Sequence, residues 1–199
     1  ARRTLGEDYL KLRGLTLPLI DDVRFHGRCP RKHSFAPALV VLMRSYTTGD
    51  AQAIQRIYIN QKTAMKDRCA HSPSGALMLG PAEGAAMMLT GWERPLRRLF
   101  LCEGFETACA ILQHGRSPIW ALGDAGRIAR FPPLEYVQEL VICADHDRVN
   151  ETTGKRAGID AALQCRERWA DNRPVVIVAP KDEGTDYADV WSRHGQAHA

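Results

Sequence analysis

The 199-residue sequence lacks features that would place it in several classes of protein. It has no apolar run of about 18 residues, so we expect no membrane-spanning helix. Its first residues, Ala1-Arg2-Arg3-Thr4, include no apolar segment typical of a secretory signal. Hydrophobic residues make up 45% and charged residues 25%, which argues against a disordered chain. We therefore expect a folded cytoplasmic protein, and the missing initiator Met suggests a processed chain or a piece of a longer one.

The six cysteines do not follow the pattern of a disulfide framework. Cys102 and Cys143 lie in apolar, strand-like runs, and Cys109 lies on a predicted helix face, so we expect buried free thiols in a reducing compartment. Zinc binding is a second interpretation for four residues, Cys29, His33, Cys69 and His71. However, only one residue separates Cys69 from His71, which is a tight spacing for two ligands of one tetrahedral zinc site.

The small net charge of +4 hides an uneven distribution along the chain. Residues 1–98 hold 16 Lys and Arg against 8 Asp and Glu, whereas residues 99–199 hold 11 against 15. A basic half followed by an acidic half predicts a surface that grips a polyanion beside a carboxylate-rich site. Scattered, solvated surface charges explain the asymmetry equally well on this evidence alone.

Residues 1–95 are predicted to form a small α+β extension. Thr4 and Glu7 have the spacing of a capping box, so a helix is expected to begin there and to end at Gly14. A polar connection is expected from there through residue 35, and an exposed loop over 60–75. The predicted strands are 38–43, 53–59, 76–79 and 85–89, which form a small antiparallel sheet.

Residues 96–199 are predicted to form a second domain of a different class. Short apolar runs alternate with helical segments, which is typical of a parallel sheet covered by helices on both faces. The predicted strands are 99–102, 119–122, 140–144 and 175–179, and the predicted helices are 105–114, a short one ending at 130, 157–169 and 187–193. The fold class is therefore α/β, Rossmann-like, with four mainly parallel strands and flanking helices.

Acidic residues follow all four of these predicted strands. Glu103 ends the first strand, and Asp145 and Asp147 follow the third. The carboxyl ends of parallel strands are where such sheets bind ligands, and clustered carboxylates need a compensating charge. A hard divalent ion such as Mg²⁺ supplies that charge and supports phosphoryl or nucleotidyl transfer. The other interpretation is that the acids cap helices, a role that suits Glu106.

The pattern resembles the toprim domain, which is shared by primases, topoisomerases and certain nucleases. The resemblance covers residues 97–195 and is greatest to primase and primase–helicase proteins of plasmids and phages. It is carried by Glu103-Gly104-Phe105-Glu106-Thr107-Ala108, by Asp145-His146-Asp147 and by Gly184-Thr185-Asp186-Tyr187-Ala188-Asp189. The sequence departs from the family pattern at His146 and at Asp124, where relatives often have Ser or Gly.

The resemblance implies DNA primase activity, a metal-dependent nucleotidyl transfer that makes primers on single-stranded DNA from nucleoside triphosphates. It implies that Glu103 is the catalytic residue and a metal ligand, that Asp145 and Asp147 hold Mg²⁺ or Mn²⁺, and that Asp186 and Asp189 complete the site. The basic half would grip the template. The candidate nucleic-acid-binding residues are Arg24, Arg28, Arg31, Lys32, Lys62, Lys66, Arg68, Arg97 and Arg98.

Other functions fit parts of the same pattern. A toprim nuclease would use the same acids to hydrolyse a phosphodiester, and a non-catalytic module would only bind nucleic acid. A phosphate-receiver domain also gathers acids at strand ends and would use Lys181, but it expects an acid pair where this chain has Glu103-Gly104. The sequence has no Walker motif and no zinc ribbon, so a helicase domain or another replication protein would have to supply those parts.

Overall fold

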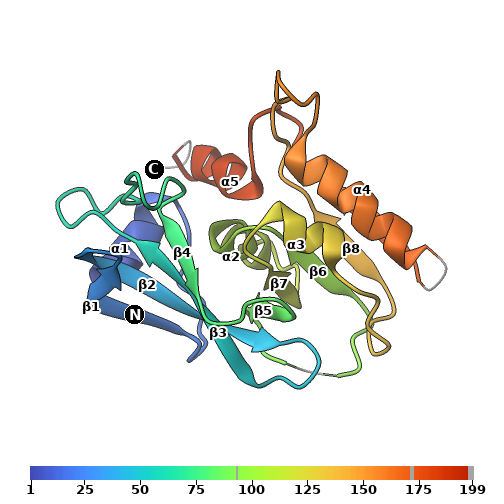
Figure 1. Cartoon of the computed structure of the whole chain (residues 1–199), viewed down its shortest axis with the longest axis horizontal. Coiled ribbons are helices and arrows are strands. Elements are labelled where there is room, and N and C mark those ends of the chain that lie inside the picture. The colour runs from blue at the N-terminus through green and yellow to red at the C-terminus, as the bar shows by residue number, and fades with distance from the viewer. Residues whose placement is uncertain (93, 171–172, 197–199) are drawn as a thin grey trace. The chain divides into compact units, whose positions relative to one another are not determined.

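A computed structural model describes residues 1–92, 94–170 and 173–196, with side chains up to Trp191 (Figure 1). Its contacts divide the chain into two compact units, Ala1–Met87 and Met88–Ala199, which are described separately below. The domain boundary that we predict near residue 95 stays a prediction. None of the described helices is long and apolar enough to cross a membrane.

The first unit opens with the predicted helix, α1 (Leu5–Leu12). The Thr4 hydroxyl caps it by accepting a hydrogen bond from the Gly6 amide, and Gly14 ends it at a φ of 68°. The Glu7 carboxylate accepts a hydrogen bond from the Arg3 amide at 2.6 Å. The predicted helix start is confirmed. In a standard capping box Glu7 would accept a hydrogen bond from the amide of the cap residue Thr4, whereas here it accepts one from the preceding residue, Arg3.

The rest of the first unit is an antiparallel sheet built around one long strand, β2 (Ser34–Ser45). This strand pairs with β1 (Val23–Arg31) and with β3 (Ala51–Tyr58), and β3 pairs in turn with β4 (Ala76–Leu79). The short strand β5 (Ala85–Met88) pairs with the end of β2. The predicted antiparallel sheet is therefore present, with longer strands than its apolar runs indicated.

The prediction of an unstructured polar connection through residue 35 is wrong, because β1 occupies part of it. Charged residues such as Arg24 and Arg28 hide the strand from a hydrophobicity pattern. β1 pairs only with β2 within this unit, so it can tolerate Pro30, whose missing N–H would interrupt a central strand. Tertiary pairing with β2 outweighs the weak local signal.

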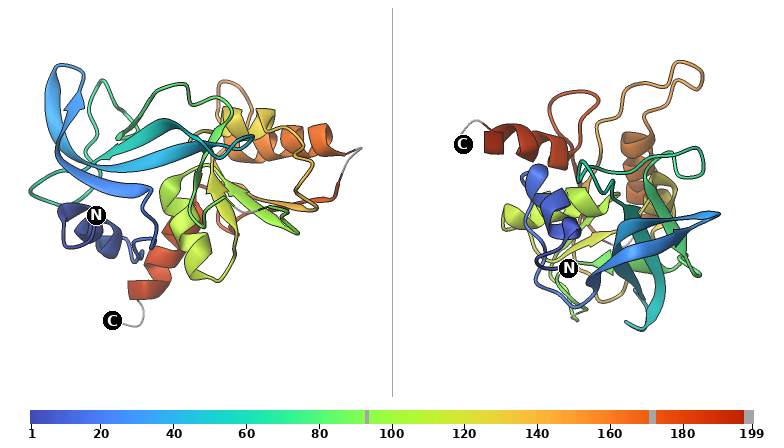
Figure 2. Two further views of the ribbon diagram at one scale, coloured as in Figure 1. Left: turned by 90° about the horizontal axis from the view of Figure 1, so that it is seen from below. Right: turned by 90° about the vertical axis from the view of Figure 1, so that its left-hand side faces the viewer.

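The second unit is a four-stranded parallel sheet in the order β7-β6-β8-β9. Figure 2 shows helices on both of its faces, with α3 and α4 on one and α2 and α5 on the other. Its strands are β6 (Leu99–Cys102), β7 (Ile119–Ala121), β8 (Leu140–Cys143) and β9 (Val175–Val178). Its helices are α2 (Phe105–Gln113), α3 (Ala125–Arg130), α4 (Ala157–Trp169) and α5 (Tyr187–Gln196). The predicted α/β fold class is confirmed.

The register of this sheet sets where the strands end. Cys102 of β6 lies opposite both Ala121 of β7 and Cys143 of β8, and Cys143 lies opposite Val178 of β9. All four strands therefore end at about the same level, as the site predicted from the acids requires. Cys102 and Cys143 are buried free thiols, as expected.

Helix α4 begins in close contact with the chain that follows β8. A Cβ atom built on Gly158, the second residue of α4, would lie 2.5 Å from the Asp145 carbonyl oxygen and 3.1 Å from its amide nitrogen. Both neighbours are backbone atoms, so neither can rotate away as a side chain would. The glycine therefore allows α4 to pack directly against the segment that carries Asp145.

We predict that Gly158→Ala destabilises the second unit by about 1–3 kcal/mol, the usual effect of overpacking. All four tryptophans lie in this unit, so their fluorescence in a denaturant titration reports its unfolding. The matched control is Gly126→Ala, at the second residue of α3, where the new methyl group would meet only the ends of the Arg130 and Asp124 side chains. An equal loss of stability in both variants would contradict the proposed close contact.

Candidate active site

The parallel register brings four acidic segments to the carboxyl edge of the sheet. Glu103 directly follows β6, Asp145 follows β8 after one residue, Asp124 follows β7 and Asp186 follows β9. Their charges interact, since the pKa of Glu103 is raised by nearby Asp147, Asp124 and Asp186 in addition to burial. Strand-end residues that lie far apart in the sequence thus form one electrostatic cluster.

Asp145 is the most constrained of these acids. Its Oδ1 atom is buried and has no hydrogen-bond partner within the described part of the chain. Burial raises the pKa of this carboxyl to about 8, together with the negative charges of Glu103, Asp186 and Asp147. A buried carboxylate oxygen without a donor is costly unless a cation or a proton satisfies it. This atom therefore marks a place where a cation would be stabilised.

The pKa of Glu103 is also raised, to about 7, mainly because the carboxyl group is buried. Its backbone carbonyl accepts a hydrogen bond from the Gly123 amide at 2.8 Å, which ties the ends of β6 and β7 together. Gly104 begins α2 with an ordinary extended backbone, φ −98°, so the turn there does not need a glycine. A carboxyl group with a pKa near 7 can both release and accept a proton at neutral pH.

Asp147 is oriented by the first turn of α4. Its Oδ2 atom accepts a hydrogen bond from the Gly158 amide at 2.8 Å. The exposed amides at the start of a helix are donors that few groups in the helix itself can satisfy, so this contact fixes the direction of the Asp147 side chain. The same glycine that packs against the Asp145 backbone therefore also holds the second aspartate of the pair.

Asp186 and Asp189 have the helix-capping role that the sequence analysis gives as the alternative to metal binding for the acids after the strands. The Asp186 Oδ1 atom accepts a hydrogen bond from the Asp189 amide at 2.7 Å, and Asp189 Oδ2 accepts one from the Asp186 amide at 3.4 Å. This is the reciprocal arrangement of a capping box at the start of α5, which the Asp-x-x-Asp spacing could have indicated. Thr107 of α2 also donates to Asp186 Oδ2, at 3.3 Å.

The two residues that depart from the family pattern are each held by a local partner. Asp124 caps α3 by accepting a hydrogen bond from the Arg127 amide at 2.9 Å, and its Oδ2 atom lies 3.0 Å from Arg127 Nε. His146 Nδ1 lies 3.0 Å from the Pro180 carbonyl oxygen, which can only accept, so this nitrogen carries a proton. Neither interaction engages Glu103 or Asp145.

The carboxylates at the sheet edge have the chemistry to bind a hard divalent cation, although their side chains are not arranged as a formed metal site. Across residues 1–92, 94–170 and 173–196, no three His, Cys, Asp or Glu side chains form a group that could hold a metal ion. The donor set at the sheet edge is nevertheless made of carboxylate oxygens, which Mg²⁺ and Mn²⁺ prefer. The buried, unpartnered Asp145 Oδ1 and the raised pKa values of Asp145 and Glu103 are the features that a cation would relieve.

The four candidate zinc ligands are likewise not gathered into a metal-binding group in the described residues. Cys29 lies in a buried cluster with Ala36, Ala38 and Tyr58, and burial raises the pKa of its thiol. The rings of His33 and His71 meet edge to face, with centroids 6.4 Å apart. Cys29 is accounted for by its place in the core of the first unit.

The predicted nucleic-acid-binding residues fall into three places. Arg24, Arg28 and Arg31 lie on β1 and Lys32 in the turn after it, Lys62, Lys66 and Arg68 lie in the loop between β3 and β4, and Arg97 and Arg98 precede β6. Arg31 pairs with Asp67 at 2.9 Å and Arg98 with Glu139 at 2.7 Å, so these two charges are already balanced. Arg28 lies over the exposed ring of Phe35, 4.6 Å from its centroid.

A parallel four-stranded sheet with helices on both faces and an acidic cluster at its carboxyl edge defines a Rossmann-like α/β protein with a candidate cation site. The family model of the toprim domain matches residues 98–197, half of the chain. The chain therefore belongs to the toprim family. A model of a domain of unknown function matches residues 1–89, and no curated protein sequence matches the chain.

Solved structures with a similar fold are primases. A DNA primase domain from Pseudomonas aeruginosa is 17% identical with a TM-score of 0.60, covering 95% of this chain and 67% of that one. The primase fragment of the bacteriophage T7 primase–helicase is 11% identical with a TM-score of 0.55, covering 96% and 66%. A DnaG primase catalytic domain bound to single-stranded DNA is 15% identical with a TM-score of 0.59, covering 96% and 70%. The chain spans about two thirds of their length, and the likeness shows the fold.

The raised pKa values of Glu103 and Asp145 predict that the protein loses stability as the pH rises. Their folded pKa values, about 7 and about 8, lie above those of exposed carboxyls, so the folded state holds protons that the unfolded chain releases. Without metal, the free energy of unfolding should fall from pH 5 to pH 9, and Asp145→Asn should recover on the order of 1–2 kcal/mol at pH 9.

Denaturant titrations in EDTA at several pH values measure this effect. Glu103→Gln should flatten the same pH profile, while Glu167→Gln, which changes an exposed carboxyl of α4, should leave the profile as in the wild type. If the free energy of unfolding of the wild type stays constant or increases between pH 6 and pH 9, the pKa values of these two carboxyl groups are not raised in the folded state.

Proposed function

We propose that this protein catalyses metal-dependent nucleotidyl transfer on nucleic acid, as a DNA primase that makes primers on single-stranded DNA. The observation that carries the proposal is the buried, unpartnered Asp145 Oδ1 beside Glu103 at the carboxyl edge of a toprim sheet. Toprim domains typically bind divalent metals, and the fold is that of solved primase domains. We expect the ion to be Mg²⁺ or Mn²⁺, because the available donors are carboxylates.

In this proposal the residues at the sheet edge have different roles in metal binding and proton transfer. Asp145 and Asp147 hold the cation, with the Asp147 side chain oriented by the Gly158 amide. A bound divalent ion would lower the pKa of an attacking 3′-hydroxyl and neutralise charge on the leaving pyrophosphate. Glu103 completes the ligand set or exchanges a proton with the reacting hydroxyl, for which a pKa of about 7 is suited.

Asp186 and Asp189 contribute to this proposed site mainly through their charge and position. Their side chains are engaged at the start of α5 and by Thr107, so they are less available than Asp145 as ligands. Their charges nevertheless raise the pKa of Asp145. We propose that they strengthen the attraction of the site for a cation.

The template surface in this proposal lies on the basic first unit. Arg28 and Phe35 at the end of the β1–β2 hairpin offer a cation beside an exposed aromatic ring, a combination that binds single-stranded nucleic acid without reading its sequence. Similar structures include a primase bound to single-stranded DNA and the primase part of a phage primase–helicase. We therefore propose single-stranded DNA and nucleoside triphosphates as ligands, a helicase or another replication protein as partner, and a plasmid or phage replication role in the cytoplasm.

We predict that the chain incorporates labelled nucleotides into short products on single-stranded DNA when Mg²⁺ or Mn²⁺ is present, and that EDTA abolishes the products. Glu103→Gln and Asp145→Asn should each lower the rate about 100-fold or more, since they remove a proton-transfer group or a metal ligand. Glu167→Gln keeps the same change of charge on an exposed part of α4 and should retain the rate.

The same assay separates primer synthesis from the other functions of toprim acids. Degradation of the template without added nucleotides, lost in Asp145→Asn, would identify a nuclease. Binding of DNA with neither synthesis nor cleavage, unchanged in both variants, would identify a non-catalytic module. Products that persist in Glu103→Gln would contradict the assignment of Glu103.

We also predict that DNA binding depends on the β1–β2 hairpin. The double variant Arg28→Gln/Lys32→Gln should bind a single-stranded oligonucleotide more weakly, and the slope of log affinity against log salt should be less steep by about 1.4 if each residue contacts one phosphate. Fluorescence anisotropy at several salt concentrations measures both. Arg166→Gln, an exposed change on α4, is the control and should keep the wild-type slope; an equal change in both proteins would contradict the hairpin surface.

A further inference from the structure

One face of the parallel sheet is only partly covered by helices. Val176 and Val178 of the edge strand β9 are 43% and 36% exposed, on the face that α2 and α5 cover farther along the sheet. Strands of parallel sheets are normally buried on both faces, because helices cover them. The outer part of this face therefore presents apolar side chains to solvent.

These valines form one wall of a groove of about 640 Å³. Its floor is the same face of the neighbouring strands, where Phe100, Val141 and Cys143 are almost fully buried. Ile111 of α2 and Val190 of α5 close its other side. An exposed apolar groove rimmed by polar residues is a feature of protein-interaction sites.

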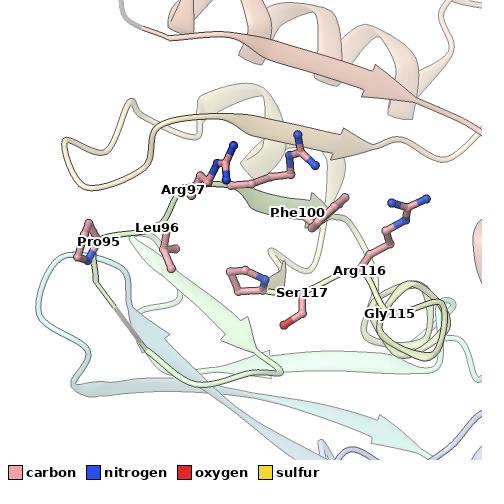
Figure 3. A pocket seen from close by; sticks show the side chains of 9 residues that line it. Pro95, Leu96, Arg97, Phe100, Gly115, Arg116 and Ser117 are labelled. Atoms are coloured by element: carbon pink, nitrogen blue, oxygen red, sulfur yellow. The ribbon is translucent and has the colours of Figure 1, made fainter.

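Arginines lie along one end of the groove. A second hollow, of about 590 Å³, shares Arg98, Phe100 and Arg116 with it (Figure 3). Arg98 is paired with Glu139. The guanidinium groups of Arg97 and Arg116 have no hydrogen-bond or ion-pair partner among the described residues, and both side chains are exposed. The rim therefore offers two uncompensated positive charges next to apolar surface.

The position of this rim separates it from the proposed active site. Arg98 precedes β6 and Glu103 follows it, so the four residues of the strand, roughly 13 Å, lie between them. The arginines thus belong to the amino edge of the sheet, opposite the edge that carries the acids. The nucleic-acid-binding role that the sequence analysis assigns to Arg97 and Arg98 stays a prediction.

The chemistry of the groove suits a protein better than a nucleic acid. Its most exposed apolar side chains are the valines Val176 and Val178, and Phe100 is only 7% exposed. Two other rings line its helical side: His114 packs edge to face against Trp191 with centroids 4.0 Å apart, and Tyr187 is partly buried, so the open surface is mainly aliphatic and offers little for stacking a base. Aliphatic surface instead favours the apolar side chains of a peptide, and the rim arginines favour carboxylates near them. Charge and apolarity together therefore define an occupant that is both amphipathic and acidic.

We propose that the groove lined by Phe100, Val141, Val176 and Val178, with Arg97 and Arg116 at its rim, docks an acidic amphipathic segment of a partner protein. Apolar residues of that segment would cover the exposed valines, and its Asp or Glu side chains would pair with the two arginines. The surface is independent of the catalytic proposal, because it includes none of the acids at the carboxyl edge.

Selection from a display library of random peptides tests the proposal, with the whole chain as bait and Arg116→Glu and Val176→Glu as counter-selecting variants. We expect the selected peptides to combine acidic and apolar residues and to bind each variant about tenfold more weakly by fluorescence anisotropy. Arg116→Lys keeps the charge and should restore most of the binding. Thermal unfolding curves check that the variants fold, and Val176→Ser replaces Val176→Glu if the latter does not.

Four results would overturn the proposal. In the selection, these are the enrichment of no peptides and the enrichment of neutral or basic peptides. In the binding measurements, they are unchanged affinity in Arg116→Glu and Val176→Ser and displacement of the bound peptide by a single-stranded oligonucleotide. The last result would assign the arginine rim to nucleic acid instead.

Discussion

The parallel pairing of β6 with β8 is the constraint on which the rest of the second unit depends. It sets Cys102 opposite Cys143, so both strands stop at the same level and the chain after each of them emerges at one edge. Glu103 and Asp145 follow those two cysteines closely in the sequence and consequently lie in one electrostatic cluster. A shift of register by one residue would turn β8 side chains to the opposite face and separate the acids.

This arrangement lowers the stability of the second unit. Burial and mutual repulsion raise the pKa values of Glu103 and Asp145, so ionising them costs folding free energy. The surrounding contacts offset part of that cost. The Gly158 amide holds Asp147, and the reciprocal bonds at the start of α5 hold Asp186 and Asp189. Asp145 Oδ1 is the atom that none of these contacts satisfies, which is why it points to a cation.

The second unit could be predicted from the sequence because its strands are short, continuous apolar runs separated by helical segments. Leu99–Cys102 and Leu140–Cys143 are examples in which no polar residue interrupts the strand. The acids at their ends were identified for the same reason, since their position relative to a strand end is a local property. The family to which the chain belongs was also visible in these residues.

The parts that were not predicted depend on contacts between distant residues. β1 escaped prediction because its arginines hide the strand pattern, and only pairing with β2 reveals it. The sequence also could not indicate that Asp67 neutralises Arg31, or that Glu139 neutralises Arg98, because each pair is distant in sequence. The interaction at the start of α5 is different, since it is local: the spacing of Asp186 and Asp189 is visible in the sequence, and helix capping is the alternative to metal binding that the sequence analysis keeps open.

These ion pairs change the meaning of the charge asymmetry between the two halves of the chain. A count of charges treats every arginine as available to a polyanion, but Arg31 and Arg98 are already paired with carboxylates. Arg97 lies in the basic half of the sequence, yet it belongs to the amino edge of the acidic unit. The positive charges of the first unit and those of the second unit therefore have different neighbours within their own units. An exposed aromatic ring lies beside the positive charge on the β1–β2 hairpin, whereas aliphatic side chains lie beside the positive charge at the sheet edge. Because those neighbours differ in what they can bind, one polyanion need not account for both.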